Sequence, residues 1–231
     1  MDTIWFEEEL EPSLDIEEVD GNRGQRIVPQ PPYQQIRGVV RVSEPVPKQL
    51  GPAPLTSGSP MMLWLVRLDF EFEPLEDGSR FKSAQCEACL EPVRLGEPIP
   101  TVYDLYPQHV YEGKPRTVSL DFSPTLKIAG VVEVLPLGRL STEVTIGRIQ
   151  HKLVGFRGDQ DRFPHWKLKV TAFPIEGIYS FWLILAQPMG CSGIRLYARA
   201  YGEIQTTWGP TPIRIYPKQQ AWGSRPSKEI R

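Results

Sequence analysis

Residues 61–73 read MMLWLVRLDFEFE, and this stretch decides the fold class. Its even-numbered residues, from Met62 to Phe72, are all apolar, whereas the odd-numbered ones change from Met61 to the charged Glu73. Successive residues of a β-strand point to opposite faces, so the pattern predicts a strand with one face in the core. We expect the other face to be buried where the strand begins and to meet water where it ends.

The same period-two alternation recurs along most of the chain. It marks out further strands at residues 36–42, 81–90, 117–122, 126–128, 131–135, 166–172, 179–187 and 194–205. Pro makes up 24 of the 231 residues, which suits short strands and stiff loops rather than long helices. The sequence therefore predicts an all-β fold, an antiparallel β-sandwich or flattened barrel of about nine or ten strands with Pro-rich loops and extended termini.

Two segments allow more specific structural predictions. Between Leu140 and Leu153 the apolar positions change parity at Gly147, which indicates a β-bulge, with a helix as the competing interpretation. Residues 179–187 are apolar on both faces, which is typical of a central strand, and the turn residues after them predict a hairpin over 179–205.

Charge divides the chain into three parts. Residues 1–20 hold nine acidic side chains and no basic one, whereas the rest holds all 26 Lys and Arg against 19 acids. We expect an acidic-hydrophobic N-terminal segment with a Pro-rich linker at 1–34, an all-β domain at 35–216 and a basic C-terminal tail at 217–231. The mixture of acids and apolar residues at the N-terminus is more typical of a docking segment than of a sheet strand, and a solvated tail is the alternative.

A partner-binding surface is predicted on the strand that runs through residues 194–205. One face of this strand alternates guanidinium and phenol groups, which suit an acidic peptide or a phosphodiester chain, whereas a solvated face is the plainer interpretation. Apolar residues of the N-terminal segment are expected to anchor such contacts, on a basic apolar surface of this chain or of a partner. The predicted partner-binding residues are Trp5, Phe6, Leu10, Arg195, Tyr197, Arg199 and Tyr201.

Few residues suggest other chemistry. Tyr103, Asp104 and His109 are candidates for a ligand pocket, although tyrosines that plug the end of a sandwich are the preferred interpretation. Cys86 and Cys89 have the spacing of a zinc knuckle, but a strand would point them to opposite faces, and Cys191 has no base near it in sequence. We expect no metal site, no thiol catalysis and no cofactor.

The predicted function follows from these observations. Motifs for nucleotide-binding loops, catalytic serines and zinc proteases are missing from the sequence, so we expect a protein that is not an enzyme. The leading hypothesis is an all-β interaction module that acts as an accessory or scaffolding subunit of a cytoplasmic complex, through a protein partner or self-association. Two alternatives are a module that binds anionic ligands or single-stranded nucleic acid through Arg195–Tyr201, and a membrane-remodelling β protein. No stretch is apolar enough to predict a transmembrane segment.

Overall fold

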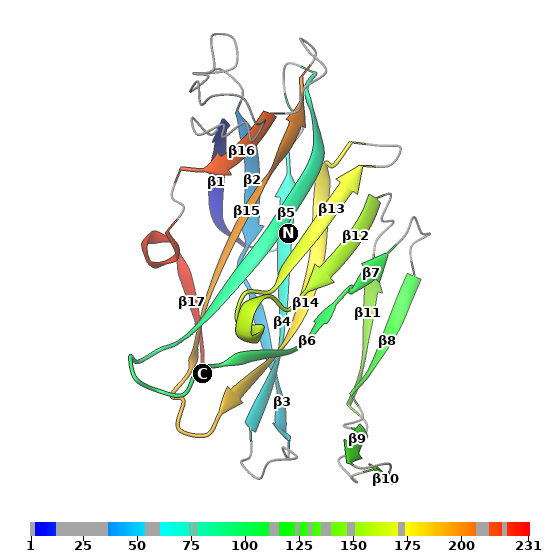
Figure 1. Cartoon of the computed structure of the whole chain (residues 1–231), viewed down its shortest axis with the longest axis vertical. Helices are drawn as coiled ribbons and strands as arrows, with labels where there is room; N and C mark the ends of the chain where they lie inside the picture. The colour runs from blue at the N-terminus through cyan, green and yellow to red at the C-terminus, as the bar shows by residue number, and fades with distance from the viewer. Residues whose placement is uncertain are drawn as a thin grey trace, which may run out of the picture.

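The computed structural model describes most of the chain as strands (Figure 1). The described residues are 3–12, 37–53, 61–73, 75, 78–110, 116–122, 125–128, 131–134, 140–146, 151–170, 174–206, 213–218 and 221–231. The predicted linker at 13–34 and the predicted bulge at Gly147 lie outside these residues.

The described strands confirm the all-β prediction. Two short 3-10 helices, η2 (Asp159–Asp161) and η3 (Trp222–Ser224), interrupt them. In chain order the strands are β1 (Ile4–Pro12), β2 (Gly38–Ser43), β3 (Val46–Ala53), β4 (Met61–Phe72), β5 (Arg80–Pro92), β6 (Thr101–Tyr106), β7 (His109–Val110), β8 (Arg116–Phe122), β9 (Thr125–Ile128), β10 (Val131–Val134), β11 (Leu140–Ile146), β12 (His151–Phe156), β13 (His165–Val170), β14 (Gly177–Pro188), β15 (Ile194–Gln205), β16 (Ile213–Pro217) and β17 (Ser227–Ile230).

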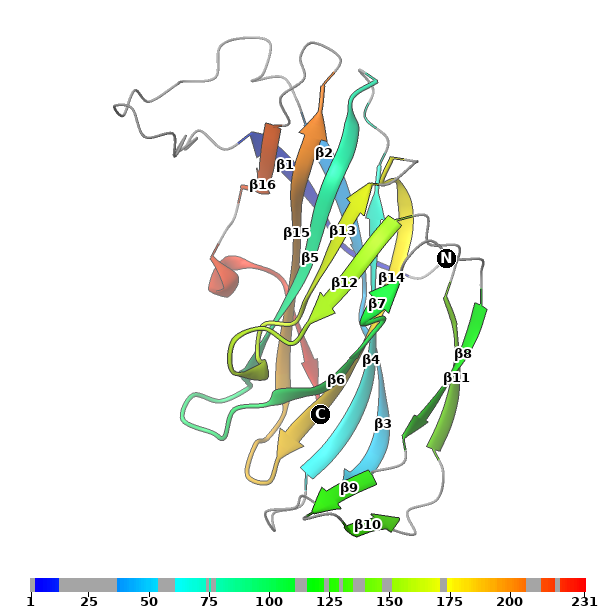
Figure 2. The ribbon, with the colours of Figure 1, turned by 45° about the vertical axis from the view of Figure 1, so that its right-hand side comes forward.

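Thirteen strands form one antiparallel sheet in the order β6-β14-β4-β2-β1-β16-β15-β5-β13-β12-β7, with β3 on β4 and β17 on β15. The sheet curls into a flattened barrel with two layers (Figure 2). One layer holds β14 and β4, the other holds β13, β5 and β15, and β1 and β16 join the layers on one side. This architecture is the flattened barrel that the alternation predicts.

A single stretch of chain joins the layers on the other side. β6 pairs with β14 at one end of the sheet order, and β7, two residues further on, pairs with β12 at the other end. Because only two residues separate β6 from β7, the pairing of β7 with β12 brings the two ends of the sheet order together and closes the sheet. We call this junction of β6–β7 with β12 the seam.

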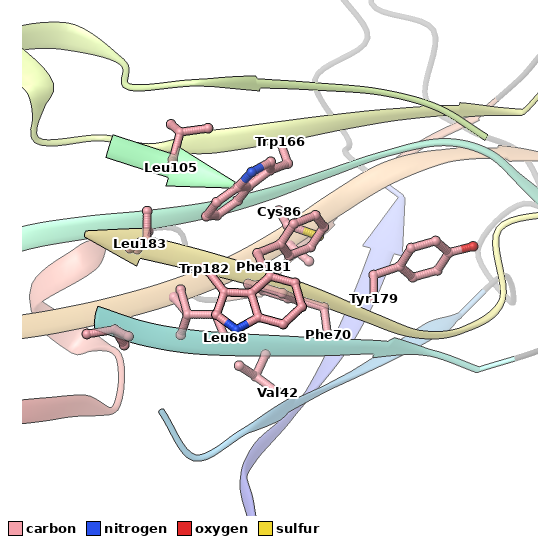
Figure 3. Packing of buried hydrophobic residues seen from close by; sticks show 14 of the residues in the cluster. Val42, Leu68, Phe70, Cys86, Leu105, Trp166, Tyr179, Phe181, Trp182 and Leu183 are labelled. Carbon is pink, nitrogen blue, oxygen red and sulfur yellow. The ribbon is translucent and has the colours of Figure 1, made fainter. Parts of the chain in front are cut away.

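Aromatic side chains fill the space between the layers (Figure 3). The ring of Trp166 on β13 stacks on Phe181 on β14 with centroids 4.4 Å apart, and Phe70 on β4 meets Phe181 edge-on at 5.8 Å. Phe70 and Phe181 have no exposed surface, as the pattern in 61–73 predicts. Burial of such large apolar side chains is the main stabilising contribution to the fold.

The predicted hairpin over 179–205 is wrong. β14 and β15 are separate strands of opposite layers, since β14 pairs with β4 and β6 while β15 pairs with β5, β16 and β17. Residues 189–193 therefore cross from one layer to the other. Alternation reveals which faces are apolar, but two apolar faces can meet across the core as well as lie side by side in one sheet.

The strands near the two termini belong to the main sheet. β1 pairs with β2 and β16, although its acids made a sheet strand unexpected, and β17 pairs with β15. The helical alternative for 140–153 is wrong, because β11 and β12 account for the described part of that segment.

Truncation of Phe70 tests the core. Phe70→Ala removes a fully buried ring from the contact between layers, so we expect a loss of about 3–5 kcal/mol in unfolding free energy, measured by denaturant titration. The neighbouring Glu71→Ala is the control, because Glu71 lies on the opposite face and its carboxylate is 4.0 Å from Arg41. Equal losses for both variants would contradict this register.

Candidate functional site

Residues 116–146 form a hairpin outside the main sheet. β8 pairs with β11 from Arg116–Ile146 to Phe122–Leu140, and β9 pairs with β10 beyond them. Neither ladder is hydrogen-bonded to the main sheet. Figure 2 shows the β8–β11 ladder standing beside the β14–β4 layer, on the side away from β5 and β15. We call residues 116–146 the hairpin.

The hairpin is attached at the seam. β7 ends at Val110 before it and β12 begins at His151 after it, and these two strands pair through Leu153–Val110 and Val154–His109. The chain therefore leaves and re-enters the main sheet at neighbouring points. Such an insertion can change its position without a change in the strand order of the main sheet.

The pairs along the β8–β11 ladder alternate in character. Val118 pairs with Val144, then Ser119 with Glu143. Because a strand's residues alternate between its two faces, this register separates an apolar set of residues from a polar one. The sequence interpretation treated 117–122 as one more strand of the sheet and missed its separate position. Only the topology distinguishes the two, since both kinds of strand alternate.

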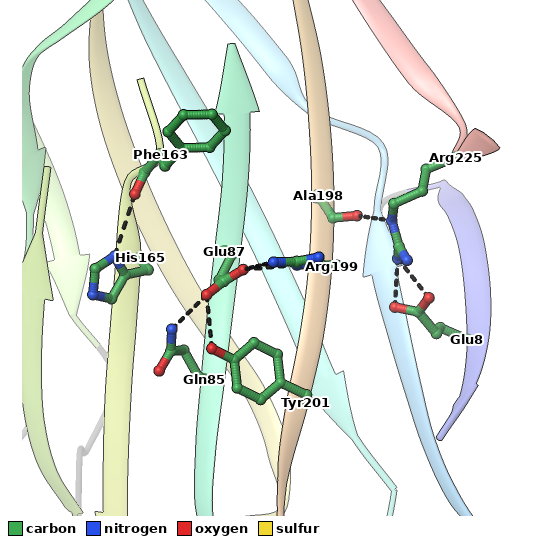
Figure 4. A network of polar contacts seen from close by, with 9 residues as sticks. All are labelled: Glu8, Gln85, Glu87, Phe163, His165, Ala198, Arg199, Tyr201 and Arg225. Atoms are coloured by element: carbon green, nitrogen blue, oxygen red, sulfur yellow. Dashed lines mark hydrogen bonds and ion pairs between the residues drawn. The ribbon is translucent and has the colours of Figure 1, made fainter. Parts of the chain in front are cut away.

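The predicted Arg195–Tyr201 face has the expected orientation, but its side chains are engaged within the chain (Figure 4). Glu87 on β5 accepts hydrogen bonds from Arg199 Nε at 2.7 Å and from the Tyr201 hydroxyl at 2.8 Å. The Arg199 guanidinium also lies 4.2 Å from the ring of Trp222. The arrangement gives no support to a nucleic-acid partner on this face.

The other two predicted residues of the face are held in a similar way. Arg195 donates to the Val93 carbonyl at 3.1 Å and forms an ion pair with Glu229 at 3.4 Å. Tyr197 is buried and donates its hydroxyl proton to Glu91 at 3.2 Å, and burial raises its pKa. The C-terminal tail, with η3 and β17, lies along this strand and takes part in these contacts.

The predicted anchors of the N-terminal segment pack on this chain's own sheet. Leu10 is fully buried, and Trp5 and Phe6 pack against the core with ring centroids 5.0 Å apart. They lie in β1 between β2 and β16, and the Phe6 ring lies 5.7 Å from the Arg225 guanidinium, which also donates a hydrogen bond to the Ala198 carbonyl on β15.

The acids of β1 each have a basic partner. Glu7 pairs with Arg41 at 2.8 Å, and Glu9 and Glu11 both pair with Lys218, at 2.8 and 3.1 Å. Glu8 and Arg225 form the buried pair, in which Arg225 Nη2 donates to both carboxylate oxygens at 2.5 and 2.6 Å (Figure 4). The segment 4–12 is thus a charged strand neutralised by residues far away in sequence.

The pocket candidates do not converge in the described structure. Tyr103 is 44% exposed, whereas Asp104 accepts hydrogen bonds from the Gln108 side chain at 2.8 Å and the Leu105 amide at 2.9 Å. Arg157 approaches Asp104 at 3.8 Å. The side chain of His109 lies outside the described residues. These contacts organise the bend between β6 and β7.

The three cysteines are free thiols in buried positions. Burial raises the pKa of Cys86 well above its ordinary value and that of Cys89 to about 12, and burial raises that of Cys191 as well. Thiolates are the form that attacks electrophiles and binds metals, and burial disfavours them here. Within the described residues no three His, Cys, Asp or Glu side chains are grouped as metal ligands.

Comparisons with known proteins return no family model and no curated protein that matches. Many solved structures match, and three of them match over most of their own length. They are Clostridium perfringens delta-toxin, at 11% identity and a TM-score of 0.40, covering 84% of this chain and 94% of that one; a pore forming protein, at 9% and 0.39, covering 84% and 90%; and the Clostridium perfringens NetB toxin in the membrane inserted form, at 9% and 0.33, covering 81% and 94%.

These matches contradict the prediction of a cytoplasmic accessory or scaffolding subunit, because all three are described as toxins or as a pore forming protein. The similarity is too distant to assign a function to this chain. In the part of the chain that the structure describes, no helix has the length and apolarity needed to cross a membrane.

The Glu8–Arg225 pair gives a pH-dependent prediction. Arg225→Met leaves the Glu8 carboxylate buried without its partner, so we expect a loss of about 3–5 kcal/mol in unfolding free energy at pH 7.5. Burial raises the pKa of Glu8 above its ordinary value of 4.5 despite the arginine, so the native state binds the proton more tightly than the unfolded chain does. Glu8 therefore contributes most to stability at low pH and least at high pH. The loss in Arg225→Met should shrink as the pH falls towards 5.

Denaturant titrations at both pH values measure this effect. Lys218→Met is the control, because Lys218 pairs with β1 acids at the exposed surface and its loss should change stability little at either pH. An Arg225→Met loss as small as that of the control, or one that grows on acidification, would contradict the role of the buried pair.

Proposed function

We propose that this protein inserts residues 116–146 into a lipid membrane as a β-hairpin, and that several copies together form a pore there. The observation that carries the proposal is the alternation in the first arm of the hairpin. From Thr117 to Lys127 every odd-numbered residue is polar, and from Val118 to Ile128 every even-numbered residue is apolar. A strand with one lipid face and one water-lined face needs this pattern.

Beyond Arg116 at the base of the hairpin, the charged residues follow the same rule. Between residues 117 and 146 they are Asp121, Lys127, Glu133, Arg139 and Glu143, all odd-numbered. The β8–β11 register pairs even-numbered residues with even-numbered ones, so the even-numbered face of this ladder carries one charge, that of Arg116 opposite Ile146 at the base, and none beyond it. A charge-free face can lie against hydrocarbon, where an ionised side chain is costly.

The length of the hairpin also fits. Its arms, residues 116–128 and 131–146, are each longer than the about 9–11 residues that a tilted strand needs to cross the hydrocarbon core. In the present β9–β10 ladder Leu126 pairs with Glu133. The end of the hairpin must therefore change register on insertion, so that the even-numbered positions of both arms share one face.

The main sheet offers a place to hold the hairpin before insertion. Leu65, Trp182 and Ile184 lie on the faces of β4 and β14 that point away from Phe181 and the core, yet they are 5–8% exposed. The β8–β11 ladder stands on this side of the sheet (Figure 2). An isolated two-stranded hairpin is only marginally stable in water, and packing on this apolar surface would stabilise it.

Insertion requires self-association. One hairpin contributes two strands, and their outer edges would leave backbone N–H and C=O groups without partners in hydrocarbon. Strands from neighbouring copies supply those partners and close the structure. The proposed activity is physical and needs no catalytic residue.

A pair of adjacent substitutions tests the proposal. Leu120→Arg places a charge on the apolar side of the hairpin, at a cost of about 2–4 kcal/mol per copy near the bilayer midplane. Ser119→Arg places the same charge on the polar side. In dye-release assays with phospholipid vesicles, we expect leakage with the wild type and Ser119→Arg and little with Leu120→Arg.

The unfolding midpoint of each variant serves as the control for folding. No leakage by the wild type on any vesicle would overturn the proposed function. Equal leakage by both variants would show that the register of the hairpin does not determine insertion.

A further inference from the structure

Four exposed cations lie close together on the outer surface of β5 and β13. They are Arg80 and Lys82 on β5, and Lys167 and Lys169 on β13, which pairs with β5 through Lys167–Gln85 and Lys169–Ser83. None of the four forms an ion pair within the described part of the chain. We call these four residues the basic strip.

Two acids on the strands that carry or flank the basic strip, Glu87 and Glu203, are engaged with other residues. Glu87 on β5 pairs with Arg199 at 2.6 Å, and Glu203 on β15 accepts a hydrogen bond from Ser83 and pairs with Arg214 at 3.4 Å. These two carboxylates therefore do not pair with the cations of the strip.

The backbone register places a further lysine position beside the strip, since Lys152 of β12 pairs with Lys169. Cations gathered on one surface attract anions through their combined field.

The position of the strip points to a particular partner. Lys169 and Val170 pair with the first residues of β12, and only residues 147–150 separate β12 from the hairpin. β12 thus starts at the end of the barrel nearest to the base of the hairpin and runs away from it. β5, which starts at Arg80, runs in the same direction (Figure 1). A hairpin that extended in line with β7 and β12 would leave the barrel at this end, beside the strip.

We infer that the basic strip docks the protein on anionic lipid headgroups, at the end of the barrel where the hairpin begins. The inference rests on the proposed function, because the direction of the hairpin places the bilayer at that end. Lysines near an anionic leaflet bind it through charge, and the attraction falls as salt screens it.

The strip fits headgroups better than single-stranded nucleic acid. Proteins that bind single strands without sequence preference use free aromatic faces for base stacking. The ring of Phe156, which lies 5.5 Å from Lys167, is already stacked on His165 with centroids 4.9 Å apart, and that of Tyr201 is stacked on Tyr216.

Vesicle flotation with the full chain tests the inference. The variant Lys167→Gln/Lys169→Gln removes two charges from the strip. The control Lys48→Gln/Arg94→Gln removes two exposed charges from β3 and from the segment after β5, at the other end of the barrel. On vesicles of phosphatidylcholine with phosphatidylserine at low salt, we expect the strip variant to bind roughly 10- to 30-fold more weakly than the wild type. The control variant should bind as the wild type does, and added salt should weaken binding.

Three outcomes would overturn the inference. They are equal binding by all three proteins, an equal loss in both variants, and tighter binding of the wild type to a single-stranded oligonucleotide than to the vesicles. The assay is independent of leakage. Vesicle binding that depends on the strip but causes no dye release would overturn the proposed function alone. Dye release that does not depend on phosphatidylserine or on the strip would overturn this inference alone.

Discussion

The closure of the sheet depends on a close approach of two backbones at Gly155. The amide of Gly155 on β12 donates to the Gln108 carbonyl at 2.8 Å, and a β-carbon added at Gly155 would lie 2.8 Å from the carbonyl oxygen of Pro107. Any side chain here would push β12 away from the bend between β6 and β7. The ring of Trp166 lies directly beside this point, so the seam and the aromatic core close together. Without the seam, β7 and β12 would be two open edges, and the hairpin would have no fixed base.

The seam also explains how one chain can combine a rigid body with a movable element. The main sheet is held by long ladders and a continuous aromatic core, whereas β7 and β12 share only two residue pairs. The hairpin follows five residues after β7, and its described strands make no ladder with the main sheet. Stability is therefore unevenly distributed, and a change in the hairpin need not disturb the core.

The alternation of residues predicted which face of each strand is buried, but not which strands pair with each other. The alternation in 61–73 and in 194–205 gave the buried faces correctly, since Phe70, Leu196 and Ala198 have no exposed surface. It could not show that β14 and β15 lie in opposite layers, because an apolar face carries no information about which strand covers it. β1 was missed for a related reason. Its glutamates are hydrophilic residues that suggest an exposed segment. Their ion-pair partners, among them Lys218 and Arg225, lie about two hundred residues away in sequence. The hairpin was missed because its strands alternate as the core strands do.

The charges of the molecule separate into two groups with different roles. The acids of β1 neutralise Arg41, Lys218 and Arg225. The acidic N-terminal strand is thereby linked by ion pairs to residues near the C-terminus. The basic strip has no such partners, and its field persists at the surface although the formal net charge of the chain is −2. A near-neutral total charge is thus compatible with strong local attraction, because screening over about 8–10 Å lets each surface act separately. The strip lies beside the point where the hairpin begins. Attraction at this point would act on orientation as well as on affinity, since it would turn the base of the hairpin towards the anionic surface before any apolar residue has to enter hydrocarbon.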